Sequence, residues 1–440
     1  MQAVRSHFHA LFDALSATLD ASEHLYACLY AERSDFVRLN NNQVRQAGHV
    51  DQYEIQLALV RTDRQCLGQY ELSNNLTIDI AEGQALIQRL KQWLADCPAD
   101  PYLYYNNSAE QSTDIQPELL TDSNTVLSAI TSNAQGLDLV GIYAAGQIAQ
   151  GFASSHGQRN WHQRALFNLD CSLHHNTRAV KMHYAGNQWS TEAFRQQLQR
   201  SRKTLELMAR PAVTLDPGRY RAYLAPTAVA ELMHLLGWDG FSLGAQKTQQ
   251  SPLQKLVAGE RQLHEQITLT EDHAGAFAAR FSDEGFSLPA RVELVRAGRA
   301  ATALCNARSA REFGQPVNAG SETPQSLSLA AGNLATENVM DALDDGLYIN
   351  HLWYGNYSDH NECRMTGLTR YACFQVKAGE CRAPIEVMRF DDSIYRLLGE
   401  QLLAITLDRQ LLHDPDTYER RSFASMHLPG ILLNEFRLTL

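Results

Sequence analysis

The sequence predicts an α+β protein with two domains: an N-terminal α/β half that carries a duplicated helix–meander–helix unit, and a C-terminal half rich in antiparallel strands. The chain has 440 residues, which is long for a single hydrophobic core. One order of helix-like and strand-like patterns occurs twice before residue 210. After Pro211, short aromatic and β-branched runs separated by glycine take over. We therefore expect domains at residues 1–210 and 211–440.

The first copy of the repeated unit is expected to begin and end with a helix. Apolar side chains from Phe8 to Leu19 recur at helical spacing. Asp79 and Glu82 have the spacing of a capping box before a second helix. Between these helices lie four strand-like runs, at residues 24–31, 34–48, 52–60 and 68–74.

The second copy follows a long polar connection at residues 96–123. Its first helix is expected to begin at Asp122 or Ser123, and its last helix to run from Ser190 to Met208. The strand-like runs between them lie at residues 137–146, 148–157, 165–175 and 177–186.

The C-terminal half is expected to contain strands around one central helix. A strand at 218–226 leads into the helix that carries Glu231, and residues 291–307 resemble a hairpin that turns at Ala297-Gly298. Apolar residues from Ile394 to Leu402 predict a late helix. Further strand-like runs lie at 347–358, 369–390 and 430–440.

Composition restricts the class of protein. The formal net charge is −11, which disfavours a nucleic-acid binder because such a protein needs a basic face. No run of about 18 apolar residues predicts a membrane span, and the N-terminus lacks the pattern of a signal peptide. The eight cysteines form no C-x-x-C pair, which is typical of reduced thiols in a cytoplasmic protein.

The stretch TAVAELMHLLGW at 227–238 raises the question of a metal site. A histidine at Ala230 would complete H-E-x-x-H, in which two imidazoles one turn apart hold zinc and the glutamate activates a bound water. The stretch is therefore either a metal site that lacks a ligand or a buried apolar helix that carries Glu231 and His234. We favour the buried helix, with His234 hydrogen-bonded at its edge.

Four segments in order along the chain resemble the TldD/PmbA peptidase family, also called the modulator-of-gyrase family. The resemblance implies two domains and assembly into dimers. It also implies two kinds of subunit: a TldD type, whose H-E-x-x-x-H and C-terminal cysteine hold a catalytic zinc, and a PmbA (TldE) type that lacks these ligands and pairs with the first. The segments are SDFVRLNNNQVRQAG (34–48), PGRYRAYLAPTAVAELMHLL (217–236), DEGFSLPARVELVRAGRAATALCNARSAREFG (283–314) and TGLTRYACFQVKAGECRAPIEV (366–387).

In the register of this family, Ala230 and Leu235 stand at the two histidine positions, and Glu231 stands at the general-base position. No cysteine follows Cys381, so the family's thiolate ligand is missing as well. The resemblance therefore implies a PmbA-like, non-catalytic subunit with no metal or cofactor of its own. Its partner is expected to be a zinc-bearing TldD-type subunit or a second copy, and its substrate an extended peptide.

Two alternatives stay open, and with them the question whether this chain is an enzyme. The chain is an active peptidase if His234, with His264 or His273, holds a metal in a different way. Otherwise it is a protein-binding regulator, in keeping with the family's link to gyrase. Aromatic faces grip extended chains with little sequence preference, so residues of the run at 351–362 are candidate peptide contacts: His351, Trp353, Tyr354 and Tyr357.

Overall fold

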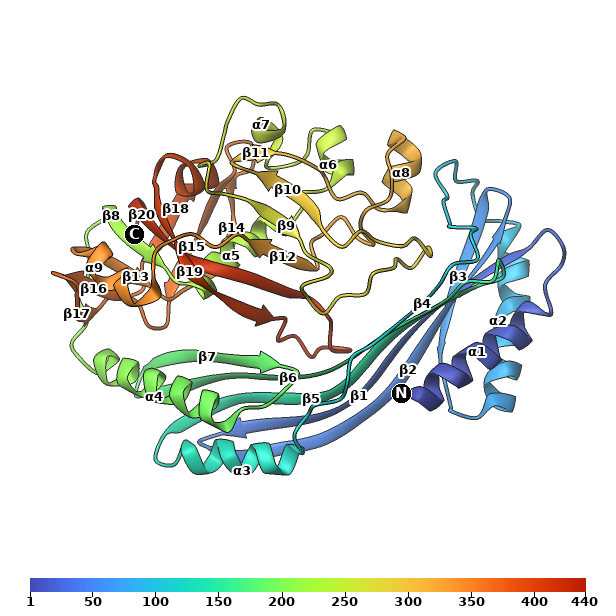
Figure 1. Cartoon of the computed structure of the whole chain (residues 1–440), viewed down its shortest axis with the longest axis horizontal. Coiled ribbons are helices and arrows are strands. Elements are labelled where there is room, and N and C mark those ends of the chain that lie inside the picture. Colours follow the sequence, from blue (N-terminus) through green and yellow to red (C-terminus); the bar gives the residue numbers. More distant parts are fainter.

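The computed structural model describes residues 1–440 and contains two β-sheets, each built from its own part of the chain. The first sheet is long and curved, and the C-terminal half of the chain lies against its inner side (Figure 1). Helices α1 and α2 lie at one end of this sheet, and α3 and α4 lie near the other end (Figure 1). None of the helices combines the length and the apolar character needed to cross a bilayer.

The first sheet confirms the predicted repeat, because one order of elements occurs twice. Each copy is a helix, three antiparallel strands and a helix. The first copy comprises α1 (Gln2–Ser16), β1 (His24–Asn40), β2 (Gln43–Arg61), β3 (Arg64–Glu71) and α2 (Leu76–Leu94). The second comprises α3 (Ser123–Asn133), β5 (Asp138–Ser154), β6 (Arg159–His175), β7 (Arg178–Gly186) and α4 (Thr191–Met208).

The two copies join through their first strands, since β1 pairs antiparallel with β5 as well as with β2. The β1–β5 contact is so close at Gly146 that a Cβ there would lie 2.0 Å from the Arg33 carbonyl oxygen. In the connection between the copies, β4 (Gln111–Ile115) adds to the sheet by pairing in parallel with β6. The strand order is β3-β2-β1-β5-β6-β4, with β7 on the remaining length of β6.

Several predicted strand boundaries in this sheet are wrong. The runs at 24–31 and 34–48 are one continuous strand up to Asn40, and the chain turns at Asn41 and Asn42, both with positive φ. The runs at 137–146 and 148–157 likewise merge into β5. The strand β1 continues through Glu32 and Ser34, which are buried and bonded across the sheet or to the other half of the chain.

The second sheet surrounds α5 (Pro226–Gly237), the predicted central helix, and includes the predicted turn at Ala297-Gly298. Its main strand order is β11-β10-β9-β12-β20-β8-β13-β16-β17, and β14, β15, β18 and β19 branch from it. The strands are β8 (Gly218–Leu224), β9 (Leu269–Glu271), β10 (Val292–Arg296), β11 (Arg299–Ala300), β12 (Ser326–Leu329), β13 (Gly346–Ile349), β14 (His351–Asp359), β15 (Arg364–Arg370), β16 (Phe374–Lys377), β17 (Glu380–Pro384), β18 (Arg389–Ser393), β19 (Leu402–His413) and β20 (Ser425–Leu438). Short helices α6 (Leu243–Lys247), α7 (Gln254–Val257), α8 (Ala307–Phe313) and α9 (Val339–Leu343) lie in the connections.

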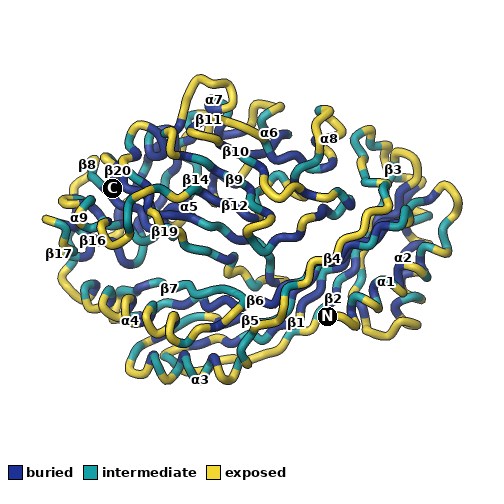
Figure 2. Tube along the Cα trace, viewed as in Figure 1, coloured by how far each residue is buried: buried dark blue, intermediate teal, exposed yellow.

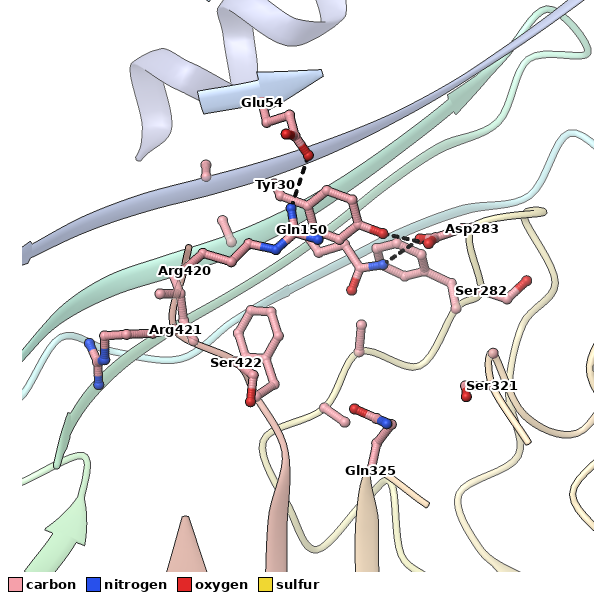
Figure 3. A pocket seen from close by; sticks show the side chains of 18 of the residues that line it. Tyr30, Glu54, Gln150, Ser282, Asp283, Ser321, Gln325, Arg420, Arg421 and Ser422 are labelled. Carbon is pink, nitrogen blue, oxygen red and sulfur yellow. Dashed lines mark hydrogen bonds and ion pairs between the residues drawn. The ribbon is translucent and has the colours of Figure 1, made fainter. Parts of the chain in front are cut away.

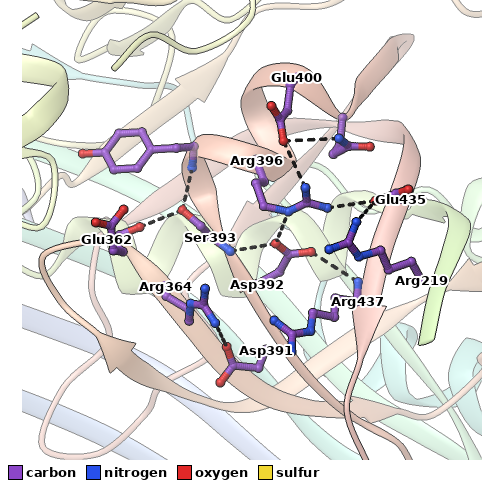
Figure 4. A network of polar contacts seen from close by, with 12 residues as sticks. Arg219, Glu362, Arg364, Asp391, Asp392, Ser393, Arg396, Glu400, Glu435 and Arg437 are labelled. Carbon is purple, nitrogen blue, oxygen red and sulfur yellow. Dashed lines mark hydrogen bonds and ion pairs between the residues drawn. The ribbon is translucent and has the colours of Figure 1, made fainter. Parts of the chain in front are cut away.

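The helix predicted from Ile394 to Leu402 is confirmed only in part. Residues 394–400 are helical, with a π-helical turn at 396–400, and the segment ends early because Gly399 leaves the helical region and strand β19 begins at Leu402. The apolar residues of this segment are buried as expected. A polar network outside them holds the turn, in which Arg396 bonds Asp392, Glu400 and Glu435 (Figure 4).

Buried residues lie in both halves of the chain (Figure 2) and form several hydrophobic cores. The largest core belongs to the C-terminal half and contains most of α5. Two others lie under the paired helices of the first sheet, and the one under α3 and α4 also contains Ala372 and Phe374 of the C-terminal half. The last element of the repeat, α4, ends beside the predicted boundary at residue 210, which itself stays a prediction.

The loop between β19 and β20 connects the two halves. The backbone N–H of Arg421 donates to Glu32 Oε2 at 3.1 Å. Its guanidinium donates to Ser34 Oγ at 3.2 Å and to the Leu166 carbonyl at 2.9 Å. Burial lowers the pKa of Arg421 to about 10, although the nearby Glu32 opposes the shift. This buried arginine therefore joins the C-terminal half to two strands of the first sheet.

We expect Arg421→Met to lower the free energy of unfolding by about 3 kcal/mol, because it removes one partner of a buried charged network. The neighbouring Arg420 is exposed and pairs with Glu54, so Arg420→Met should cost only about 1 kcal/mol or less. Urea unfolding followed by fluorescence measures the free energy of unfolding of both variants. Equal losses for the two variants would contradict the assigned role of Arg421.

Candidate functional site

The central helix α5 is apolar on almost every side. Pro226 occupies its first turn, and the helix packs against β14 and β20. This packing explains why the helix forms without a side-chain cap, since its stability comes from tertiary burial. Its buried side chains are Ala228, Val229, Leu232, Met233, Leu235 and Leu236.

The face of α5 at the family's ligand positions is closed by β14. Leu235 is 1% exposed, and Ala230 packs against the same core. Glu231 Oε1 accepts a hydrogen bond from the Gly355 N–H at 3.2 Å. The Tyr357 hydroxyl donates to the Leu235 carbonyl at 2.8 Å. Two hydrogen bonds thus attach β14 to this side of the helix.

The contact at Gly355 is too close for a Cβ unless the side chain of Leu235 or Glu231 moves. A Cβ there would lie 2.8 Å from Leu235 Cδ1 and 3.0 Å from Glu231 Oε1. The residues at this position therefore do not fit a catalytic zinc, which takes three protein ligands and an open coordination position. Nowhere in the chain do three His, Cys, Asp or Glu side chains gather as metal ligands.

The three histidines of the alternative metal site are not brought together. His234 is exposed, with its ring 5.7 Å from that of Trp238, so the predicted hydrogen-bonded position is wrong. His264 lies in the loop before β9, and its Nδ1 accepts from the Gln266 N–H at 3.2 Å. His273 is buried, with Nδ1 2.9 Å from the Pro289 carbonyl oxygen.

The four candidate peptide contacts separate into two kinds. Trp353 and Tyr354 are 46% and 76% exposed, and the Arg370 guanidinium lies 4.2 Å from the Trp353 ring centroid. His351 is different, because it is half-buried, its Nδ1 is shielded from solvent, and burial lowers its pKa to about 4. Tyr357 points back to α5. Trp353 and Tyr354 are thus the two candidates that are fully on the surface, whereas His351 and Tyr357 are half-buried.

A second site, which the sequence did not predict, is a cavity of about 880 Å³ between the two halves of the chain. Figure 3 shows Tyr30, Glu54 and Gln150 of the first sheet on one side and Gln325 and Ser422 on the other. Its walls come from at least five segments that are far apart in the sequence. No local pattern could therefore have revealed it.

Hydrogen bonds order the wall formed by the first sheet (Figure 3). Asp283 accepts from the Tyr30 hydroxyl and, at 2.8 Å, from Gln150 Nε2. Burial and the carboxylate of Asp283 raise the pKa of Tyr30 well above its usual range, so this hydroxyl stays a donor. Arg420 lies across the Tyr30 ring, 3.8 Å from its centroid, and reaches Glu54 at 3.1 Å.

Glu271 is the most strongly buried acid in the cavity wall. Its Oε1 accepts from the backbone N–H groups of Gln325 and Ser326, both at 2.8 Å, whereas its Oε2 has no partner. Burial raises the pKa of Glu271 to about 7, Asp272 contributes in the same direction, and the two N–H groups oppose the shift. His273 Nε2 lies 3.6 Å from Glu271 Oε1. Burial lowers the pKa of His273, so the imidazole is neutral at pH 7.

The first prediction from this site concerns Gly355. We expect Gly355→Ala to lower the free energy of unfolding by about 1–3 kcal/mol, because the new methyl group overlaps Leu235. Leu235→Ala opens space at the same point, so the double variant should lose less than the sum of the two single variants. Denaturant titrations of the four proteins test this coupling, and strict additivity would count against it.

The second prediction concerns pH. The carboxyl of Glu271 has a higher pKa in the folded chain than the usual 4.5, so its ionisation reduces stability as the pH rises from about 4.5 to 7. Glu271→Gln keeps the acceptor for the two N–H groups and removes this loss. Relative to the wild type, it should gain about 3 kcal/mol more at pH 8 than at pH 4.5. Melting temperatures at both pH values measure the difference, and a gain independent of pH would refute it.

A family model matches the C-terminal half of the chain, and solved structures match its whole length. Residues 217–440 match the model described as the PmbA/TldA metallopeptidase C-terminal domain. TldE from Thermococcus kodakarensis superposes with a TM-score of 0.79 at 14% identity, covering 99% of this chain and 100% of its own. A candidate modulator of a DNA gyrase from Thermotoga maritima has a TM-score of 0.76 at 15% identity, covering 98% and 100%. Another from Bacteroides thetaiotaomicron has a TM-score of 0.70 at 14% identity, covering 99% and 98%.

A comparison with curated proteins gives no match. The structural relatives establish the fold over the whole length, including both sheets. The match at 217–440 contains α5 and every strand that surrounds it, and it spans more than half of the 440 residues. On this evidence, the chain belongs to the PmbA/TldD family.

Proposed function

We propose that this chain is a PmbA/TldE-like subunit of a peptide-processing metallopeptidase assembly, that it does not itself cleave peptides, and that it pairs with a zinc-bearing TldD-type subunit. The closed face of α5 carries this proposal. A hydrolytic zinc needs about three protein ligands. Here an alanine, a leucine and the backbone of Gly355 occupy the corresponding space.

Glu231 has a structural role in this proposal. A general base must reach the proton that it removes, usually from a metal-bound water in this class of enzyme. The Glu231 carboxylate instead accepts from the backbone of β14. It thereby positions the strand that carries the two exposed aromatic side chains, Trp353 and Tyr354.

The exposed part of β14 suggests how the chain contributes to the assembly. Trp353 and Tyr354 offer flat apolar surfaces, and Arg370 supplies a cation beside them. Such surfaces hold extended peptides or partner subunits with little sequence preference. We infer that this chain supplies one wall of a chamber whose chemistry belongs to the partner.

Glu231→Gln tests the assignment. Glutamine can still accept from the Gly355 N–H, so the variant should fold and should support peptide cleavage by the assembly at a rate within about twofold of the wild type. Loss of a general base costs about 10²–10⁴-fold. Rates measured with a zinc-bearing TldD-type subunit distinguish the two roles, with Glu206→Gln on exposed α4 as the control.

The chain alone should contain no stoichiometric zinc by elemental analysis and should leave peptides intact. Zinc bound at one ion per chain, together with cleavage that Glu231→Gln abolishes, would overturn the proposal.

A protein-binding regulator is the second candidate, because two of the structural relatives are described as candidate modulators of DNA gyrase. The two roles differ in the partner. Affinity purification of the tagged chain should recover a TldD-type subunit. Recovery of gyrase without such a subunit would favour the regulator.

A further inference from the structure

We propose that the cavity between the two halves binds a basic side chain of a peptide, that is, a lysine ammonium or an arginine guanidinium. That the ligand is a peptide rests on the proposed function. The preference for a cation rests on the cavity alone.

The charge of the cavity wall is the first argument. Six carboxylates and two guanidiniums line it, which leaves four negative charges in excess when all are ionised. Both arginines are already engaged, since Arg421 bonds to the first sheet and points away from the other labelled side chains, and Arg420 pairs with Glu54 (Figure 3). The six acids are Glu32, Glu54, Glu71, Glu271, Asp283 and Glu419.

Two of these acids each have one carboxylate oxygen without a hydrogen-bond partner. Glu271 and Glu32 are 1% and 2% exposed, and both line the cavity. Glu271 Oε2 and Glu32 Oε1 have no hydrogen-bond partner. A buried carboxylate oxygen without a donor is costly, and an ammonium or guanidinium group supplies donors and charge together. Both oxygens are shielded from solvent, so we expect binding to turn these side chains toward the ligand.

The placement of the acids and the aromatic lining favour an organic cation over a metal ion. The acids lie on different strands and loops, and no three of them converge as metal ligands. The aromatic rings of Phe281 and Phe423 also line the cavity, and they suit a guanidinium or an ammonium with its methylene stem. The volume of about 880 Å³ accommodates a side chain with its flanking backbone.

The test uses two neutral-ended peptides, acetyl-Ala-Ala-Lys-Ala-Ala-amide and the same peptide with norleucine in place of lysine. Isothermal titration of the purified chain at pH 8 and low salt should show the lysine peptide binding at least about tenfold more tightly. Glu271→Gln and Glu32→Gln should each reduce this preference about tenfold, consistent with the loss of a charge-assisted bond. Glu206→Gln, on α4 outside the cavity, is the matched control.

Equal affinities for the two peptides, no binding of either, or a lysine preference that survives both cavity substitutions would each overturn the proposal. Circular dichroism checks that the variants fold. If either buried variant does not, Glu71→Gln at the exposed part of the wall replaces it. Because the isolated chain is used, a failure here is distinguishable from a failure of the proposed pairing, which is measured by cleavage with a TldD-type subunit.

Discussion

The close approach of β14 to α5 at Gly355 closes one side of the central helix, the side that carries Glu231 and Leu235. A catalytic zinc keeps one coordination position open to water or substrate, so the helix face that holds its ligands must be accessible. Here the backbone of β14 lies directly against Leu235 and Glu231, and a Cβ at Gly355 would require one of these side chains to move. The helix is therefore retained as a core element, and the glutamate at the general-base position bonds to a neighbouring strand.

The boundary between the two halves has apolar and polar parts. Ala372 and Phe374 belong to a cluster of the first sheet and its helices, and Phe281 belongs to a cluster that contains Phe152. The cavity wall, in contrast, contains carboxylates, amides and one buried arginine. Polar groups of this kind contribute little net stability and require exact partners. Glu271 even reduces stability at neutral pH, since burial disfavours its charged form. A wall that costs stability is expected where a ligand supplies the missing contacts.

The sequence allowed much of the fold to be predicted, because helical spacing and strand alternation are local signals. The repeated unit, α5 and the hairpin at Ala297-Gly298 all depend on such signals. The long strand β1 could not be predicted, since the buried partners of Glu32 and Ser34 come from a loop almost 390 residues away. The cavity was missed for the same reason: its residues meet only after the two halves come together.

The backbone at Tyr354 connects the closed helix face to the exposed surface. Its φ of 58° lies in the left-handed region, which a bulky residue adopts only when its surroundings hold it there. Two hydrogen bonds hold it. The Gly355 N–H donates to Glu231, and the hydroxyl of Tyr357 donates to the Leu235 carbonyl. These anchors maintain an irregular stretch of β14 that turns Trp353 and Tyr354 outward. Glu231 and Leu235 therefore also support the aromatic surface through which, under the proposed function, the chain meets its peptide or its partner.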